Sequence, residues 1–293
     1  MIQSTLRGTM TDMLGATKPG LRRILEQLLQ SVAPNKAQAA WGVVTAALLY
    51  LNLKRFPFVG IHIWWPKNGL FEHQPGAIFQ PVVTPSRVAL LETDYNLHKS
   101  NSTYFSDLDV ARTDLLAALR AQAIDGGLYK EYKKGVQILL AGTSCTFKKE
   151  IKPGATFDMQ SRILTWDKKW LYVVTHFVEK RKGAELPIYQ PWEEAGDRRA
   201  IQGSPVVYAT AISKCVVKAG RLTVPPQNFF RAAGVLPSED QPEGTIAYIT
   251  PEADEVGGWT WDKVEEERLE ALLIADGFAG GLDAAHEKAH LLV

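Results

Sequence analysis

The residue types that could do chemistry in this sequence gather in one short stretch, T-D-Y-N-L-H-K-S-N-S-T-Y, which begins at residue 93. Asp94 and His98 are side chains that can take up a proton, and the amides of Asn96 and Asn101 suit tight turns. The stretch leads into a predicted helix, and a helix start has free backbone N–H groups and a partial positive charge. A carboxylate beside such amides could attack a carbonyl carbon while the amides stabilise the resulting oxyanion.

The same residues also have a purely structural interpretation. Asp and Asn before a helix commonly cap it or form the turn, which stabilises a protein by about 1 kcal/mol per cap. Asp107 and Asp109 lie early in the predicted helix, where the dipole favours carboxylates, although Asp107 could also face a pocket. Tyr104 lies where a packing residue of the helix is expected. Spacing alone leaves both interpretations open.

A long helix is predicted from Ser102 to the glycines near residues 125–127. Its apolar residues recur at spacings of three and four and form one face: Tyr104, Leu108, Ala111, Leu115 and Leu119. Glycine suits the left-handed conformation that often ends a helix. A short strand is predicted just before the reactive stretch, over residues 87–93.

The sequence after this helix has the period of two that is typical of strands. Strands are predicted over residues 136–147, 156–163, 171–180 and 206–217, with a turn at 166–170. The first of these is apolar on both faces, which predicts a covered central strand. One long helix followed by antiparallel-type strands indicates an α+β fold in which a sheet wraps the helix.

The chain is predicted to have three parts. Residues 1–85 form an N-terminal helical segment and an irregular arm, residues 86–235 form the α+β domain, and residues 236–293 form an extension. The extension contains one amphipathic helix near residues 260–276. Within the central domain, residues 183–205 are a polar, proline-bearing insertion.

Composition restricts the expected partners and cofactors. The 293 residues include 33 Lys and Arg against 32 Asp and Glu, with no basic stripe, so a nucleic acid is not expected as a partner. Two cysteines, Cys145 and Cys215, are too few for a disulfide framework and are predicted to be reduced, buried thiols. The sequence has neither a phosphate-binding loop nor a dinucleotide fingerprint, so no cofactor is expected.

One metal-binding pattern occurs but is not expected to bind metal. H-E-K-A-H at residues 286–290 matches the zinc motif H-E-x-x-H. It lies three residues from the end of the sequence, which leaves no room for the usual third ligand downstream, and a terminal helix is a poor place for a rigid site. No metal is therefore predicted.

An apolar segment near the N-terminus raises the question of membrane contact. Residues 37–53 contain no charge but are fewer than the roughly 20 residues that a spanning helix needs. Residues 18–32 before them are amphipathic. Together the two segments predict either a membrane-surface anchor or a helical pair packed on the main domain, and hence a cytoplasmic or membrane-associated protein.

The reactive stretch resembles a known family. D-Y-N-L-H-K-S-N-S-T-Y, followed by D-L-D-V-A-R, is similar to the hot-dog thioesterases of the 4-hydroxybenzoyl-CoA thioesterase type, and most of all to their THEM6-like branch. Such proteins usually read D-x-N-x-H-M-N-N-x-x-Y at this point. The residues in register with that pattern are Asp94, Asn96, His98, Asn101 and Tyr104. The chain departs from it at Lys99 and Ser100, and the resemblance covers roughly residues 86–235.

The resemblance implies a hot-dog fold, a long helix wrapped by a curved antiparallel sheet, in a homodimer whose active sites lie at the subunit boundary. It implies an acyl thioester substrate, carried by CoA or a carrier protein, on which Asp94 acts as nucleophile or activates a water. The predicted catalytic residues are Asp94, His98 and Asn101. The predicted substrate-binding residues are Asn96, Ser102, Thr103, Tyr104 and Asp107.

Two alternative functions keep the same fold. The N-terminal arm and the insertion at residues 183–205 could reshape the pocket for a bulky ring, which would suit a lyase or cyclase acting on a polyketide-type metabolite. The departures at Lys99 and Ser100, together with the apolar segment, would suit a membrane-associated hot-dog protein without catalytic activity.

Overall fold

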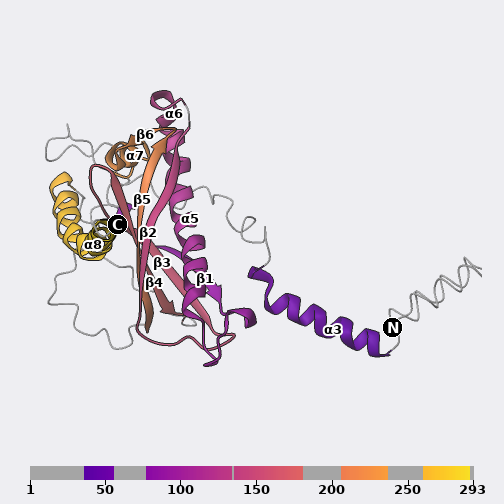
Figure 1. Cartoon of the computed structure of the whole chain (residues 1–293). Helices are drawn as coiled ribbons and strands as arrows, with labels where there is room; N and C mark the ends of the chain where they lie inside the picture. Colours follow the sequence, from indigo (N-terminus) through magenta and orange to yellow (C-terminus); the bar gives the residue numbers. More distant parts are fainter. Residues whose placement is uncertain (1–35, 56–76, 134, 181–205, 237–259, 291–293) are drawn as a thin grey trace, which may run out of the picture. The chain divides into compact units, whose positions relative to one another are not determined.

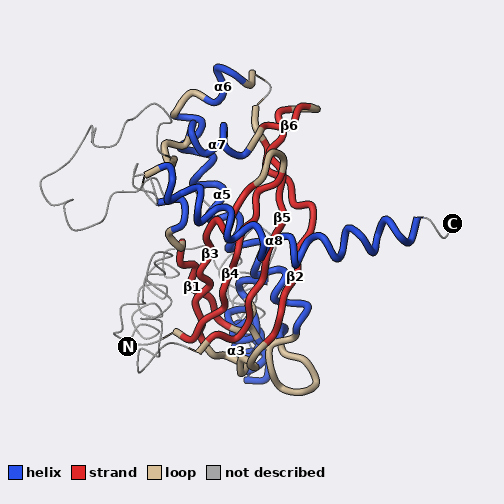
Figure 2. Tube along the Cα trace, turned by 90° about the vertical axis from the view of Figure 1, so that its left-hand side faces the viewer, coloured by secondary structure: helices blue, strands red, loops and turns tan. Residues whose placement is uncertain are grey.

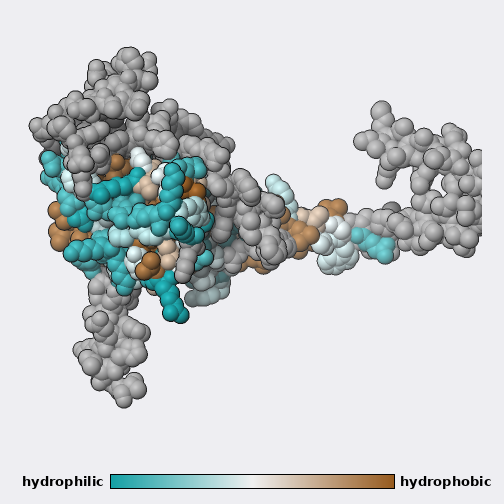
Figure 3. All heavy atoms as spheres, turned by 90° about the horizontal axis from the view of Figure 1, so that it is seen from above, coloured by the Kyte–Doolittle hydropathy of each residue, from teal (hydrophilic) through white to brown (hydrophobic). Residues whose placement is uncertain are grey.

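The computed structural model describes residues 36–55, 77–133, 135–180, 206–236 and 260–290, which belong to two compact units, 1–53 and 54–293. The predicted amphipathic segment at residues 18–32 and the insertion at residues 183–205 lie outside the described residues. The first unit contributes one described helix, α3 (Lys36–Leu51). Hydrophobic side chains along α3 are exposed, among them Trp41, Val43 and Tyr50. Figure 3 shows hydrophobic atoms, in brown, on the surface of this helix. Among the described residues, no helix combines the length and apolarity that crossing a membrane requires.

The second unit is built on an antiparallel sheet with helix α5 along one face (Figure 1). Its strands are β1 (Val82–Arg87), β2 (Gln137–Phe147), β3 (Thr156–Trp166), β4 (Trp170–Glu179), β5 (Val207–Ala219) and β6 (Leu222–Val224). The order across the sheet is β1-β3-β4-β5-β2, and β6 pairs with β5. Figure 2 shows β1 and β2 on opposite sides of the sheet. The predicted turn at residues 166–170 is confirmed, because the Asp167 side chain accepts hydrogen bonds from the Lys169 and Trp170 amides.

Helix α5 (Asn101–Asp125) forms where its apolar period predicts it, and all five predicted face residues are buried. It packs on two apolar clusters, one beneath each half of the helix. The short helices α6 (Leu128–Glu131) and α7 (Pro226–Ala232) follow α5 and β6 respectively. α7 packs beside the end of α5, where a Cβ on Gly126 would lie only 1.8 Å from the Ala232 carbonyl oxygen. Glycine is therefore required at this close approach.

The opposite face of the sheet is covered by α8 (Trp261–His290), which is longer than the helix predicted at residues 260–276. Ala271 and Ala275 of α8 pack against β3, β4 and β5, and the Arg268 guanidinium donates to the Trp166 carbonyl over 2.7 Å. The H-E-K-A-H residues 286–290 belong to the part of α8 whose side chains are not described. The sheet thus lies between α5 and α8.

Two strand predictions are wrong. Residues 87–93 are not a strand: β1 ends at Arg87 and a 3₁₀ turn, η3 (Leu90–Glu92), follows, because the Glu92 carboxylate folds back to accept from the Ala89 amide. The strand predicted at residues 136–147 exists as β2, but it is an edge strand with exposed apolar side chains. A strand that is apolar on both faces can be covered by its own sheet or left for a partner, and the sequence pattern is the same in both cases.

Both cysteines are free thiols, as predicted; Cys215 is buried as expected, whereas Cys145 is only half-buried, contrary to the prediction. Burial raises the thiol pKa of each to about 11, so both are protonated at neutral pH. A protonated thiol is a weak nucleophile, so neither cysteine is a candidate reactive group.

We predict that His176 in β4 makes the fold acid-sensitive. Burial, and then the nearby Arg162 charge, lower its pKa from 6.5 to about 4. Because folding lowers this pKa, the unfolded chain binds a proton at His176 at a higher pH than the folded protein does. The free energy of unfolding is therefore unaffected above pH 6.5 and decreases as the pH falls from 6.5 towards 4. The expected loss of unfolding free energy by pH 4 is about 3 kcal/mol. Urea unfolding measured across this range should show His176→Gln losing less stability than the unmodified protein. Parallel curves for the two proteins would contradict the prediction.

Candidate active site

The reactive stretch forms a closed turn between η3 and α5. Thr93 and Lys99 form an antiparallel bridge across its base. Inside the turn, the Asp94 amide donates to the His98 carbonyl over 3.0 Å, and the Leu97 amide donates to the Asp94 carbonyl over 3.1 Å. Leu97 has a φ of 60°, in the left-handed region that non-glycine residues seldom occupy. The turn is therefore a defined structure that holds its side chains in fixed directions.

The Asp94 carboxylate lies at the rim of this turn with two polar neighbours. One oxygen, Oδ1, accepts from the Asn96 amide over 2.9 Å, and Oδ2 lies 3.4 Å from Nδ1 of His98. The same Nδ1 lies 3.3 Å from the Lys99 carbonyl oxygen, and because both neighbours are acceptors, the hydrogen belongs on Nδ1. These contacts hold the Asp94 side chain in place, and because it is 22% exposed, a substrate can still reach it.

The start of α5 provides the free amides that oxyanion binding needs. Ser100 is the N-cap residue, and its side chain makes no capping hydrogen bond. The Thr103 amide is engaged by the Ser100 carbonyl over 3.0 Å. In the part of the chain that the structure describes, no hydrogen bond engages the amides of Asn101 and Ser102. The amides of Asn101 and Ser102 therefore remain available to bind an oxyanion.

A buried lysine lies directly beneath the turn, at a position where the resembling family usually has methionine. The Lys99 ammonium is fully buried and lies 2.7 Å from Asp107 Oδ2 and 3.3 Å from Glu92 Oε2. It also donates to the Thr103 hydroxyl over 3.0 Å. The rings of Tyr104 and Phe157 flank it, with centroids 5.0 and 5.6 Å away. Lys99 therefore connects η3 and the reactive turn to the first two helical turns of α5.

A second lysine, at the start of the second unit, contacts the same two carboxylates. The Lys54 ammonium lies 2.7 Å from Glu92 and 3.2 Å from Asp107, and it donates to the Ser86 hydroxyl over 3.2 Å. We call Lys54, Glu92, Lys99 and Asp107 the ion quartet. Two positive and two negative charges compensate one another in it, which lets the protein bury them.

Sequence reasoning missed most of the ion quartet. In the sequence, Lys99 is apparent only as a departure from the family pattern, and no pattern marks Glu92 or Lys54. One local signal exists: Thr103 and Asp107 are spaced by four on one face of α5, and Lys99 lies four residues before Thr103, just ahead of the helix. The contacts of Lys54 and Glu92 link distant parts of the chain and have no such local pattern.

The predicted site residues separate into two layers. Asp94, Asn96, His98, Asn101 and Ser102 lie in or beside the turn and reach the surface at least in part. Thr103, Tyr104 and Asp107 are buried below them. Tyr104 packs edge-on against Phe147 and Phe177, at centroid distances of 5.0 and 4.9 Å, and burial raises the pKa of its hydroxyl. The lower layer therefore supports the upper one.

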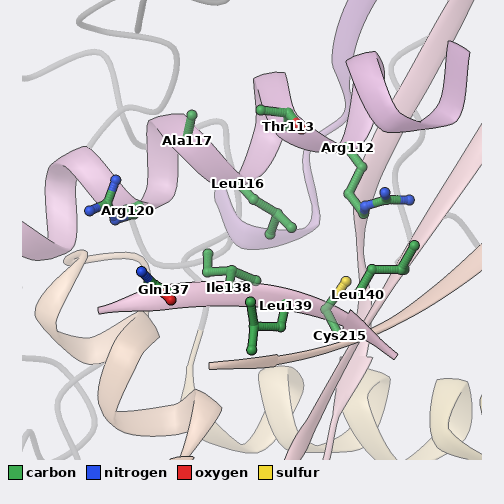
Figure 4. Close-up of a pocket in the computed structure, with 10 residues that line it drawn as sticks. All are labelled: Arg112, Thr113, Leu116, Ala117, Arg120, Gln137, Ile138, Leu139, Leu140 and Cys215. Carbon is green, nitrogen blue, oxygen red and sulfur yellow. The ribbon is translucent and has the colours of Figure 1, made fainter. Parts of the chain in front are cut away.

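A pocket lies further along α5, between this helix and β2 (Figure 4). Its volume is about 490 Å³, and Asp94 is not among its lining residues. The helix contributes Arg112, Thr113, Leu116, Ala117 and Arg120, and the sheet contributes residues 137–140 and Cys215. From Asn101 to Arg112 the helix rises by roughly 16 Å, so the pocket and the turn are separate features of one protomer.

Comparison with known proteins identifies the family. The model of the thioesterase-like superfamily matches residues 88–233. The thioesterase lcsJ of Purpureocillium lilacinum is 33% identical over 242 residues, which cover 73% of this chain and 72% of that protein. The thioesterase poxG of Penicillium oxalicum is 37% identical over 221 residues, covering 72% and 70%. The chain belongs to the thioesterase-like superfamily.

Membership confirms the expected hot-dog fold, with its antiparallel sheet and long helix, and the expected class of enzyme, a thioesterase-like hydrolase. The expected THEM6-like branch is confirmed too: protein THEM6 of Xenopus laevis is 27% identical over 139 residues, which cover 47% of this chain and 56% of that protein. The reactive turn, the ion quartet and α5 all lie inside the matched residues apart from Lys54.

We predict that replacing Lys99 by methionine, the residue usual in the resembling family, destabilises this protein. Lys99→Met leaves two buried carboxylates with one ammonium, which should lower the free energy of unfolding by about 3–5 kcal/mol. Lys148→Met, at an exposed position, should change it by less than about 0.5 kcal/mol. Adding Asp107→Asn to Lys99→Met removes one excess negative charge and should restore part of the loss. Equal stabilities of Lys99→Met and Lys148→Met in urea unfolding would contradict this account.

Proposed function

We propose that this protein hydrolyses an acyl thioester at the turn of residues 93–104. The observation that carries the proposal is the fixed, partly exposed Asp94 carboxylate in a turn that leads into a helix start with two free amides. A carboxylate of this kind can supply the base or nucleophile, and the amides of Asn101 and Ser102 can stabilise the negative charge on the carbonyl oxygen.

In the simplest form of the reaction, Asp94 takes a proton from a water molecule as the water oxygen bonds to the acyl carbon. The carbonyl oxygen gains negative charge, and the helix amides donate to it. The carbon–sulfur bond then breaks, the sulfur leaves as a thiol after receiving the proton, and the acyl group leaves as a carboxylic acid. Direct attack by the Asp94 oxygen would give the same products after hydrolysis of an acyl-enzyme.

His98 holds Asp94 in this proposal. Its Nδ1–H lies between the Asp94 carboxylate and the Lys99 carbonyl, so the ring fixes the direction of the carboxylate. The same contact also permits a reversed arrangement, in which Asp94 orients the ring and His98 Nε2 takes the proton. The two arrangements differ in which side chain is indispensable for the reaction.

We also propose that the working enzyme is a homodimer paired through β2. This strand has eleven residues, carries no charge and contains no proline, and it exposes Leu139, Leu140 and Phe147. A long apolar edge strand without charges or proline invites pairing with another strand. The opposite edge, β1, is short and contains Pro85, so it is less suited to pairing.

Pairing through β2 would bring the pocket and the reactive turn together across the subunit boundary. In an antiparallel pair related by a twofold axis, the start of one strand lies beside the end of the other. The pocket lies at the start of β2, near Gln137, and the ring of Tyr104 from the first turn of α5 contacts Phe147 at the end of β2. The pocket of one protomer would then lie next to the partner subunit's Asp94.

Three finer expectations stay proposals beside this function: a polyketide-type acyl group as substrate, contact of residues 37–53 with a membrane surface, and the division of the chain at residues 85 and 235. The exposed apolar side chains of α3 support the second.

We predict that Asp94→Asn abolishes thioester hydrolysis, with a fall in kcat of at least about a hundredfold, because the amide can neither accept the proton nor attack. The measurement is release of free thiol from a series of acyl-CoAs of different chain lengths. Asp276→Asn, at an exposed position in α8, is the matched control and should keep full activity. His98→Gln should retain measurable hydrolysis. If His98→Gln is as inactive as Asp94→Asn, the reversed arrangement holds; if Asp94→Asn is fully active, the proposal fails.

We predict that Leu139→Lys separates the dimer, because a charge on the β2 edge would have to be buried in the interface. Light scattering should give about twice the chain mass of 32.5 kDa for the unmodified protein and the single chain mass for the variant. Thiol release should fall together with the mass. Leu222→Lys, at an exposed position in β6, should change neither the mass nor the thiol release. A fully active monomer of the unmodified protein would contradict the dimer proposal.

A further inference from the structure

The pocket between α5 and β2 contains a buried cation. The Arg112 side chain is only 9% exposed, and Figure 4 shows it reaching from α5 towards β2, near Leu140 and Cys215. Of the ten residues that line the pocket, two are arginines and none is acidic. The pocket therefore has a positive charge that its own lining does not compensate.

The contacts of Arg112 leave part of its guanidinium available. Nη1 donates to the Ser213 hydroxyl over 3.1 Å, and Nη2 pairs with the Asp109 carboxylate. A guanidinium has five N–H donors, so these two contacts do not use them all. The Asp109 side chain is 60% exposed, and a carboxylate surrounded by water compensates a buried charge only weakly. An oxygen acceptor from a ligand would complete the environment of Arg112.

Apart from its two arginines, the pocket is lined by apolar or neutral side chains. Leu116, Ile138 and Leu140 point between the helix and the strand (Figure 4), and the Cys215 thiol is protonated. At the far end, Arg120 is already engaged by the Val136 carbonyl over 2.8 Å and the Tyr129 hydroxyl over 3.3 Å. From Arg112 to Arg120 the helix rises by about 12 Å, which suits a medium-length acyl chain. The pocket thus combines an apolar middle with a polar end at Arg112.

We propose that this pocket selects acyl groups that carry an oxygen acceptor along or at the end of an otherwise apolar chain, and that Arg112 donates to that oxygen. The inference rests on the proposed thioester hydrolysis and names its substrate class. A hydroxyl or keto oxygen and a carboxylate share this chemistry. An unsubstituted chain would leave the buried N–H donors of Arg112 without an acceptor, which costs affinity.

The test compares three CoA thioesters of equal, medium chain length: unsubstituted, with a terminal hydroxyl and with a terminal carboxyl. The unmodified protein should show kcat/KM at least about tenfold higher for one or both oxygen-bearing thioesters, since a hydrogen bond to a charged group discriminates by that order. Whether the hydroxyl or the carboxyl is preferred identifies the acceptor. In Arg112→Met, the ratio of kcat/KM for the oxygen-bearing thioesters to kcat/KM for the unsubstituted thioester should fall close to one. Arg87→Met, an exposed arginine outside the pocket, should keep the preference.

Binding of the three corresponding free acids, measured by calorimetry, separates this inference from the proposed function. If no thioester is hydrolysed but the oxygen-bearing acids bind about tenfold tighter, the hydrolysis proposal fails and the pocket assignment stands. If all three thioesters are hydrolysed equally well, the pocket assignment fails. Should Arg112→Met not fold, Ala117→Trp fills the pocket from a half-exposed position and should weaken binding of the oxygen-bearing acids. Unchanged binding in Ala117→Trp would overturn the assignment.

Discussion

The buried ammonium of Lys99 is the constraint on which the reactive turn depends. A positive charge close to a helix start is opposed by the helix dipole, and its burial removes its water. Both costs are offset only because Asp107 of α5 and Glu92 of η3 lie within 3.3 Å of the ammonium. The backbone of the turn must therefore pass where it carries Lys99 between these two carboxylates. That path sets the bridge to Thr93 and the position from which α5 begins.

This constraint fixes the groups that could do chemistry without involving them in the ion quartet. Asp94 lies five residues before Lys99 and the free amides of Asn101 and Ser102 just after it, so both are attached to the same anchored backbone. Groups held in place before the substrate arrives need no reorganisation during the reaction, which is the main advantage of a preorganised site. Lys54 extends the anchoring to the start of the second unit. The stability of the turn and the direction of Asp94 are thus consequences of the same contacts.

The sequence predicts those parts of the structure that depend on local periodicity. Leu108, Leu115 and Leu119 repeat with the helical period, so the predicted start of α5 lies within one residue of the observed start. The strand of residues 171–180 follows from its composition and flanking turn. What the sequence does not reveal depends on contacts between distant residues. The apolar neighbours of Glu92 predict a strand there, whereas the lysines that it binds are residues 54 and 99. The pocket likewise requires α5 and β2 to be adjacent, which no local pattern contains.

The proposed dimer would explain three features that are unfavourable in a single protomer. β2 exposes apolar side chains at an unpaired edge, the pocket is open beside that edge, and Tyr95 and Leu97 are exposed apolar residues on either side of Asn96 in the reactive turn. Exposed apolar surface of this kind is costly for an isolated protomer in water. In the proposed dimer, a twofold axis at β2 would cover the edge and put the open pocket next to the other protomer's turn, where an acyl chain could contact both. The pairing of the edge would then determine not only the assembly but also which acyl groups reach Asp94, because one protomer would supply the carboxylate and the other the chain-binding pocket.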